Sequence, residues 1–116
     1  PYPGTQTIRT DRLPCADASV DVAFLLFAAH EVRDPAERAL FFRELRRVLR
    51  STGRVVVTEH LRDAANALAY TLGVFHFHSP AVWAATFRAG GFRVARQFRH
   101  TPFVAVYILE KDGAAP

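Results

Sequence analysis

The sequence has 116 residues, of which 50% are hydrophobic and 22% are charged. These values are typical of a single globular domain and exclude a disordered chain or an array of repeats. Lys and Arg total 15 against 11 Asp and Glu, a net charge of +4, which is too small to indicate a nucleic-acid partner by itself.

The cysteine content, the apolar runs and the lack of methionine give expectations about compartment, membrane spans and processing. The single cysteine, Cys15, cannot form an internal disulfide, so we expect a reducing compartment, the cytoplasm. The longest purely apolar run covers residues 22–29, far fewer than the roughly 18 residues that cross a bilayer, so we expect no membrane span. Because methionine is absent and the first residue is Pro1, we expect a chain that was processed, trimmed or cut from a longer one.

The first predicted elements are a strand and a helix. Residues 20–29 (VDVAFLLFAA) form a nearly continuous apolar run, which is typical of a strand buried on both faces of a parallel sheet. Asp34, Pro35 and Glu37 then supply an N-cap, a first-turn proline and a capping-box acid. The helix is expected to run to about Arg50, with an apolar stripe on one side and arginines on a solvated face.

A second strand follows the helix. Ser51, Thr52 and Gly53 predict the end of the helix, with Gly53 in a left-handed C-terminal cap. Residues 54–59 (RVVVTE) are rich in β-branched side chains and predict a strand. Strand, helix and strand in this order form a βαβ unit, whose two strands lie side by side and parallel.

The remaining elements complete one α/β domain. Residues 64–75 and 79–89 predict two short helices, and Gly90 and Gly91 end the second of them. Residues 92–99 and 103–110 alternate apolar and polar side chains and predict an antiparallel hairpin. The expected fold class is therefore α/β, with a parallel βαβ unit followed by helices and an antiparallel β-hairpin.

Two segments carry a resemblance to a known family. Residues 13–22 (LPCADASVDV) and residues 47–54 (RVLRSTGR) resemble the middle of class I S-adenosylmethionine-dependent methyltransferases. The branch most similar is the one that includes the ubiquinone and menaquinone biosynthesis C-methyltransferases. Its members read roughly LPFPDxSFDxV before a buried fourth strand and RVLKPGG before a fifth strand with an acidic end, here Glu59. The resemblance implies the C-terminal portion of a Rossmann-like methyltransferase sheet.

The resemblance also implies that a part of the family's site is absent. The glycine-rich loop after the family's first strand, and the acidic residue that ends its second strand, have no counterpart in residues 1–116. In dinucleotide-binding folds, such features bind phosphate and ribose groups of the cofactor. We therefore expect residues 1–116 to be a single partial methyltransferase domain that lacks the N-terminal glycine-loop half.

The resemblance implies a function for the intact parent protein. It would transfer a methyl group from S-adenosylmethionine to a small, apolar or aromatic molecule, and this fragment would be weak or inactive alone. An alternative is a noncatalytic truncated α/β module that binds a protein partner through its open sheet edge. The exposed strand of residues 20–29 would also favour self-association. A nucleic-acid-binding domain is a third and weaker alternative, because no aromatic platform interleaves the arginines.

The candidate catalytic residues lie at the predicted carboxyl ends of the two parallel strands. Ligands of open α/β sheets sit outside the carboxyl ends of the strands. His30 with Glu31, and His60 with Glu59, occupy these positions in the sequence. Either histidine is a candidate base for an acceptor that must lose a proton, and the alternative is that both are loop residues with satisfied hydrogen bonds.

Four residues are candidate cofactor contacts by resemblance. Asp11 and Leu13 lie near the position at which the family holds the adenine, although Arg9 occupies the spacing-equivalent position of the family's acidic residue. Phe27 and Ala28 would offer backbone groups to the methionine end of the cofactor. The alternatives are that Asp11 is an ordinary turn aspartate and that Phe27 and Ala28 are ordinary strand core.

The candidate substrate contacts combine two carboxylates with a group of aromatic residues. They are Glu31, Glu59, Tyr70, Phe75, Phe77 and Trp83. Aromatic residues at the mouth of a site would favour an apolar or aromatic substrate, and simple core packing is the alternative. His76 and His78 form a pair with no clear third and fourth ligand, so we expect no metal.

Overall fold

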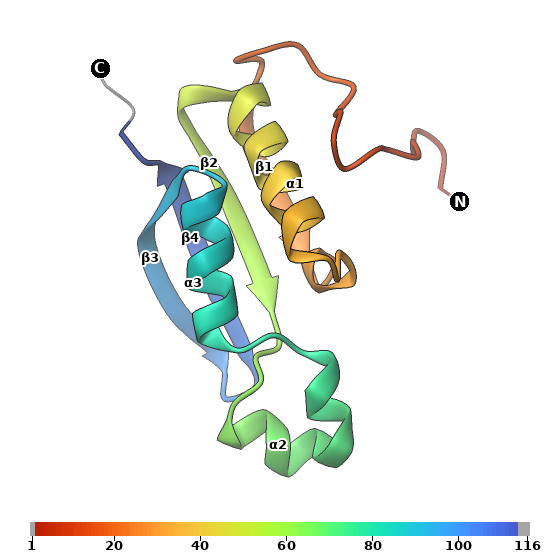
Figure 1. The fold of residues 1–116 in the computed structure, drawn as a ribbon, viewed down its shortest axis with the longest axis vertical. Coiled ribbons are helices and arrows are strands. Elements are labelled where there is room, and N and C mark those ends of the chain that lie inside the picture. Colours follow the sequence, from red (N-terminus) through yellow and green to blue (C-terminus); the bar gives the residue numbers. More distant parts are fainter. Residues whose placement is uncertain (1, 114–116) are drawn as a thin grey trace.

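A four-stranded sheet in the order β1-β2-β4-β3 organises residues 2–113, the part of the chain that the computed structural model describes (Figure 1). The strands are β1 (Val20–Leu26), β2 (Leu49–Glu59), β3 (Phe92–Thr101) and β4 (Val104–Lys111). β1 and β2 are parallel, and β4 is antiparallel to both β2 and β3. The predicted βαβ unit and hairpin are confirmed, and the second strand of the hairpin lies inside the sheet while β3 forms an edge.

Two helices cover one face of this sheet. They are α1 (Pro35–Val48) and α3 (Pro80–Ala89), which lie side by side (Figure 1). The predicted N-cap of α1 is confirmed, because the Asp34 carboxylate accepts hydrogen bonds from the backbone N–H groups of Ala36 and Glu37. Ser79 caps α3 in the same way through the N–H of Val82. None of the helices described in residues 2–113 is long and apolar enough to cross a membrane.

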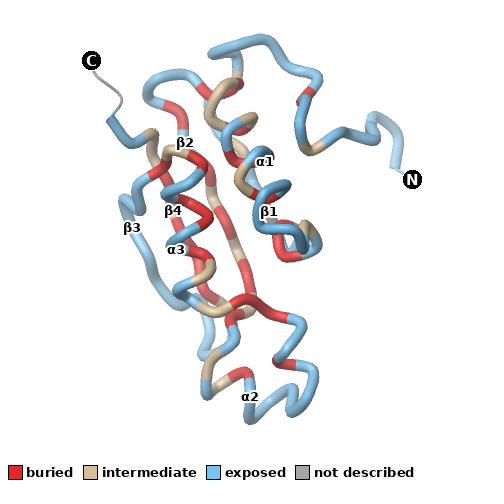
Figure 2. The backbone as a smooth tube through the Cα atoms, in the orientation of Figure 1, coloured by how far each residue is buried: buried red, intermediate tan, exposed pale blue. Residues whose placement is uncertain are grey.

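The core fills the space between these helices and the sheet. Its largest completely buried apolar side chains are Phe42, Trp83 and Phe87, with exposed fractions of 0–1%. Phe42 contacts Phe87 with ring centroids 5.5 Å apart, and Phe87 stacks on Trp83. Figure 2 shows this buried layer in red along β2, β4 and the inner sides of the helices. The aromatic layer fixes the helices relative to the two central strands.

Three short helical segments follow β1 and β2. A 3-10 helix, η1 (Ala29–Glu31), comes directly after β1, and α2 (Ala64–Tyr70) and the 3-10 helix η2 (Thr71–His76) come after β2. Figure 1 shows α2 beyond the end of β2 to which its arrow points. The carboxyl ends of the parallel strands are therefore the region in which η1 and η2 meet.

The end of α1 differs from the prediction. The helix ends at Val48, and Leu49 already has extended backbone as the first residue of β2. Gly53 lies within β2, at an irregularity where the register changes from Val20↔Leu49 to Val22↔Arg54. An added Cβ at Gly53 would lie 3.0 Å from the carbonyl oxygen of Arg50 and 3.1 Å from that of Asp21. Close approach of two strands, and not a left-handed cap, therefore requires this glycine.

The environment of β1 also differs from the prediction of a strand buried on both faces. β1 is an edge strand with helices on one side only. Its alternate residues Val22, Phe24 and Leu26 are 44%, 64% and 60% exposed, because successive side chains of a strand point to opposite faces. Residues 2–113 contain no helix that covers this second face. The expectation of an exposed apolar edge is confirmed.

The arginines of α1 do not form the freely solvated face that the sequence predicts, because several of them bond to neighbouring segments. Arg38 is 3% exposed and donates hydrogen bonds to the Thr86 hydroxyl and the Val32 carbonyl. Arg46 donates to the carbonyl of Gly91, and Arg47 forms an ion pair with Asp17 that links α1 to the segment before β1. These arginines therefore connect the helix to its neighbours.

Candidate functional site

The parallel register brings the ends of β1 and β2 together. Leu26 pairs with Thr58, and the backbone N–H of Phe27 donates a 2.9 Å hydrogen bond to the Thr58 carbonyl. Phe27 has a φ of 52°, a left-handed conformation that is uncommon for a residue with a side chain and is enriched at functional sites. The chain turns here from β1 into η1, which carries His30 and Glu31.

A buried acid–imidazole pair lies at this turn. Nδ1 of His30 lies 2.6 Å from Oε2 of Glu59, and the backbone N–H of His30 donates to Oε1 of the same carboxylate. Glu59 is completely buried, and the side chain of His30 is 9% exposed. Burial raises the pKa of Glu59, while the bonds from His30 oppose that rise. The carboxylate thus fixes the imidazole through Nδ1 and leaves Nε2 for a second partner.

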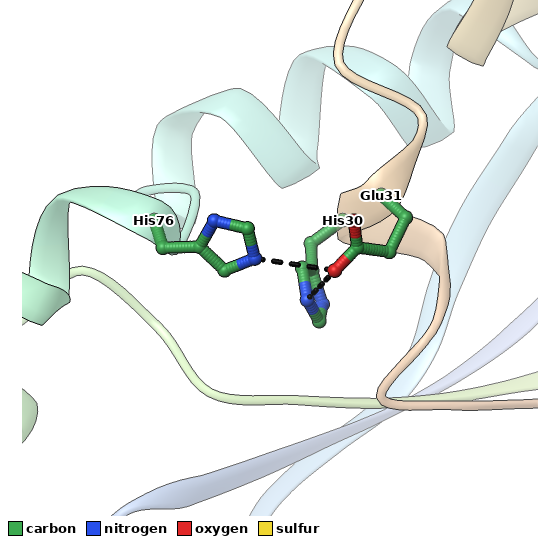
Figure 3. A group of neighbouring side chains, drawn as sticks. All are labelled: His30, Glu31 and His76. Atoms are coloured by element: carbon green, nitrogen blue, oxygen red, sulfur yellow. Dashed lines mark hydrogen bonds and ion pairs between the residues drawn. The ribbon is translucent and has the colours of Figure 1, made fainter.

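Nε2 of His30 faces a second carboxylate. Oε1 of Glu31 lies 3.0 Å from Nε2 of His30 and 3.2 Å from Nε2 of His76 (Figure 3). The bonds from His76 and the charges of the two imidazoles lower the pKa of Glu31. Arg33 holds the two segments together, because its guanidinium donates to the carbonyls of His30 and His76.

His60 lies in an aromatic cluster beside this pair. Its ring stacks between those of Phe27 and Phe77, with centroids 5.1 Å away on each side. Nδ1 of His60 donates to the Phe103 carbonyl at 2.8 Å, and Nε2 lies 3.5 Å from the hydroxyl of Tyr70. The structure therefore brings both candidate bases to one region, but gives only His30 a carboxylate partner. Glu59, the sequence neighbour of His60, pairs with His30 instead.

The candidate substrate residues divide between the surface and the core. Tyr70 and Phe75 are 42% and 62% exposed, whereas Phe77 is 8% exposed and contacts both His30 and His60. Trp83 is completely buried and stacks on Phe87. This placement favours a packing role for Trp83 and leaves Tyr70 and Phe75 accessible beside the histidines.

The two histidines of residues 76 and 78 lie in different environments. His76 is half exposed and meets Glu31, whereas His78 is buried against Trp83, 3.4 Å from the guanidinium of Arg38. Burial and the charge of Arg38 lower the pKa of His78 to about 4. The sequence pattern offered these histidines as a pair, but His76 ends η2 while His78 follows it, and the two side chains meet different partners. The sequence alone gave His76 no partner besides His78, and the structure places it against Glu31.

The cofactor candidates lie in two places. Phe27 and Ala28 lie at the end of β1, directly before His30. Asp11 is exposed and forms a 2.8 Å ion pair with Arg9, which lowers the pKa of its carboxyl group. The side chain of Leu13 is buried in the core, and its carbonyl accepts a hydrogen bond from Arg47. Only the strand-end pair is therefore adjacent to the histidine cluster.

Comparisons with known proteins give a family match over part of the chain and a fold. Residues 5–57 match the sequence model of a family described as a methyltransferase domain. A search of curated proteins found no match. Among solved structures, the chain is similar to a SAM-dependent methyltransferase from Aquifex aeolicus, with 18% identity and a TM-score of 0.74. That match covers 90% of this chain and 52% of the other, so the chain spans about half of that protein.

Two further solved structures are similar over shorter shares of their length. The mitomycin 7-O-methyltransferase MmcR has 19% identity and a TM-score of 0.72, with 90% of this chain and 32% of that chain covered. CalO1, a methyltransferase of calicheamicin biosynthesis solved in its SAH-bound form, has 17% identity and a TM-score of 0.70, with coverages of 92% and 33%. The chain thus matches the methyltransferase domain family over residues 5–57 and has the fold of a part of a class I S-adenosylmethionine-dependent methyltransferase.

Proposed function

We propose that this chain is the acceptor-side part of a domain that transfers a methyl group from S-adenosylmethionine to a small molecule. The observation that carries the proposal is the buried His30–Glu59 pair at the carboxyl ends of two adjacent parallel strands. Ligands of open α/β sheets bind at such strand ends. The match of residues 5–57 to the methyltransferase domain family supports the same reaction.

His30 is the catalytic base in this proposal, and Glu59 is its positioning residue. When bound, S-adenosylmethionine would supply an electrophilic methyl group to the nucleophilic atom of the acceptor and would leave as S-adenosylhomocysteine. Nε2 of His30 takes the proton that the acceptor loses, once the acceptor displaces the exposed Glu31 carboxylate from this nitrogen. Glu59 fixes the tautomer through Nδ1 and stabilises the imidazolium that forms. Phe77 packs edge-on against the ring of His30.

The acceptor in this proposal is a small molecule with an aromatic or apolar body and an ionisable group. Tyr70 and Phe75 provide exposed aromatic surface next to His60 and Arg62. Aromatic side chains with a few polar groups are typical of small-ligand sites. The printed name of one structural neighbour, a mitomycin 7-O-methyltransferase, is consistent with this class of acceptor.

The cofactor would contact the end of β1 in this proposal. The backbone of Phe27 and Ala28 would meet its methionine part, and Asp11 with Leu13 would lie on the side of its adenine. The chain spans about half of the Aquifex methyltransferase, so the remaining contacts would come from strands that this chain does not contain. We therefore propose that residues 1–116 are a partial domain with weak cofactor binding and little activity alone.

The catalytic role is tested on a polypeptide that carries this chain together with the preceding strands of the domain. Release of S-adenosylhomocysteine is measured with a panel of small phenols and amines. We expect His30→Gln to lower kcat by about 100-fold or more, with His100→Gln, an exposed histidine on the hairpin, as the matched control. Glu59→Gln should move the acidic limb of the pH–rate profile. A His30→Gln variant with the unchanged rate would contradict the proposal.

A second candidate function rests on the uncovered face of β1. Phe24 and Leu26 are more than half exposed on an edge strand, which favours a noncatalytic module that binds a protein partner through the open edge. The hypothesis of a noncatalytic module predicts no release of S-adenosylhomocysteine by the longer polypeptide. It also predicts a change of binding or oligomeric state when Phe24 is replaced by lysine, and these two results together would replace the first candidate.

A further inference from the structure

Three side chains from two distant segments direct donor atoms to one point. These are Nε2 of His30 and a carboxylate oxygen of Glu31, both on η1, and Nε2 of His76 at the end of η2. Glu31 Oε1 lies 3.0 Å from the first nitrogen and 3.2 Å from the second, and all three donors lie within 4.8 Å of one another. Figure 3 shows both imidazoles turned toward the same carboxylate.

We propose that His30, Glu31 and His76 form a binding site for one divalent transition-metal ion, with zinc as the best-fitting ion. Zinc bonds to histidine nitrogen and carboxylate oxygen at about 2.0–2.2 Å, so tetrahedral ligands lie about 3.3 Å apart. The separations of the Glu31 oxygen from the two nitrogens are close to that value, and the two nitrogens lie within 4.8 Å of each other. Two histidines with one carboxylate, and a fourth position open to solvent, form a common zinc ligand set.

The residues behind the ligands are arranged as in metal sites. A metal-bound imidazole commonly donates its other N–H to a carboxylate, which fixes the ring and raises its basicity. Glu59 occupies this place, because its buried carboxylate lies 2.6 Å from Nδ1 of His30. The negative charges of Glu31 and Glu59 together balance the charge of a divalent ion.

Two further contacts hold the segments that carry the ligands. Arg33 donates to the carbonyls of His30 and His76 at 3.2 and 2.7 Å and thereby joins η1 to the end of η2. Phe77 packs against the rings of His30 and His76. The site also has access, because the side chains of Glu31 and His76 are 65% and 52% exposed. A metal ion can therefore enter without opening the core.

The metal site shares His30 with the proposed methyl transfer, but the two proposals can be tested separately. A metal bound at Nε2 of His30 occupies the nitrogen that the proposed base uses, so metal binding and proton acceptance exclude each other. Zinc should therefore inhibit methyl transfer if both proposals are correct. Binding of zinc to a chain that has no methyltransferase activity would support the metal site alone, and activity without zinc binding would support only the base.

Calorimetric titration of the untagged, chelator-treated chain with Zn²⁺ tests the site. We expect one equivalent to bind with a dissociation constant in the micromolar range or tighter. His76→Gln removes an exposed ligand and should weaken binding more than 10-fold, and Glu59→Gln should weaken it about 10-fold through His30. His100→Gln, which replaces an exposed histidine on the hairpin, should leave the affinity unchanged.

A second measurement identifies the ligand geometry. Co²⁺ bound to the wild-type chain should give the intense visible absorption of a tetrahedral site, and the His76→Gln variant should give the weak absorption of hydrated Co²⁺. Millimolar or absent binding of Zn²⁺ by the wild type would overturn the proposal. Equal affinity of the wild type and the folded His76→Gln variant would overturn it as well.

Discussion

The Glu59 carboxylate is the residue on which the site geometry depends. It is completely buried and satisfies both the Nδ1 atom and the backbone N–H of His30. Glu59→Ala should lower the free energy of unfolding by about 3 kcal/mol, because it leaves a buried imidazole and a buried amide without partners. Urea denaturation in the presence of a chelator measures this change. Glu31→Gln is the matched control on an exposed carboxylate, expected within about 0.5 kcal/mol of wild type.

His78 makes stability depend on pH. Its pKa is lowered to about 4 in the folded chain by burial and by Arg38, against about 6.5 in the unfolded chain. Between these values the unfolded state binds more protons, so stability falls as the pH decreases from about 6.5 to 4 and is complete only above that window. The loss attributable to His78 is about 3 kcal/mol at most.

Denaturation curves at a series of pH values check this prediction. They are recorded with a chelator present, for the wild type and for His78→Asn, which cannot take up a proton. Below pH about 6.5, the variant should lose less stability than the wild type. Parallel pH profiles of two folded proteins would contradict the assignment to His78.

Among the elements, the crossing of α1 and α3 depends on Gly90. A Cβ at this position would lie 2.4 Å from Cβ of Phe42, a contact between two helices that cannot be relieved by a flexible side-chain end. Gly90→Ala should therefore lower the free energy of unfolding by about 2 kcal/mol. Gly73→Ala is the control, because its Cβ would meet Tyr70 at an ordinary 3.7 Å. Equal stability of the two variants would contradict the close packing of these helices.

The helices and strands could be predicted from local signals in the sequence. Features that depend on contacts between elements could not. Asp34 and Pro35 identify the start of α1 because capping involves neighbouring residues only. Gly53 was wrongly predicted as a helix cap, because the irregularity that needs it arises from the pairing of β2 with β1. The partner of Glu59 also depends on strand register, so the sequence placed this carboxylate near His60 rather than on His30.

At the scale of the whole molecule, we expect the uncovered face of the sheet to determine whether the chain self-associates. The apolar side chains of β1 are exposed at an edge, which favours pairing with a second chain. Phe24→Lys should reduce self-association without loss of stability, since Phe24 is 64% exposed. Sedimentation velocity over a range of concentrations measures the effect.

Leu68→Lys provides the control for this prediction. Leu68 is 86% exposed on α2, away from the sheet, so its replacement removes apolar surface without changing the edge. We expect this variant to associate like the wild type. Equal effects of the two lysine variants would show that general hydrophobicity, and not the edge of β1, causes association.

We propose that this chain carries the acceptor side and a part of the cofactor side of a methyltransferase site. Titration of the isotope-labelled chain with S-adenosylhomocysteine, followed by ¹H–¹⁵N NMR, tests it directly. We predict shifts of the amides of residues 27–31 with a dissociation constant in the millimolar range, and no shifts in the turn of the β3–β4 hairpin. Micromolar binding by the monomer, or unchanged amides at residues 27–31 in millimolar ligand, would contradict the account.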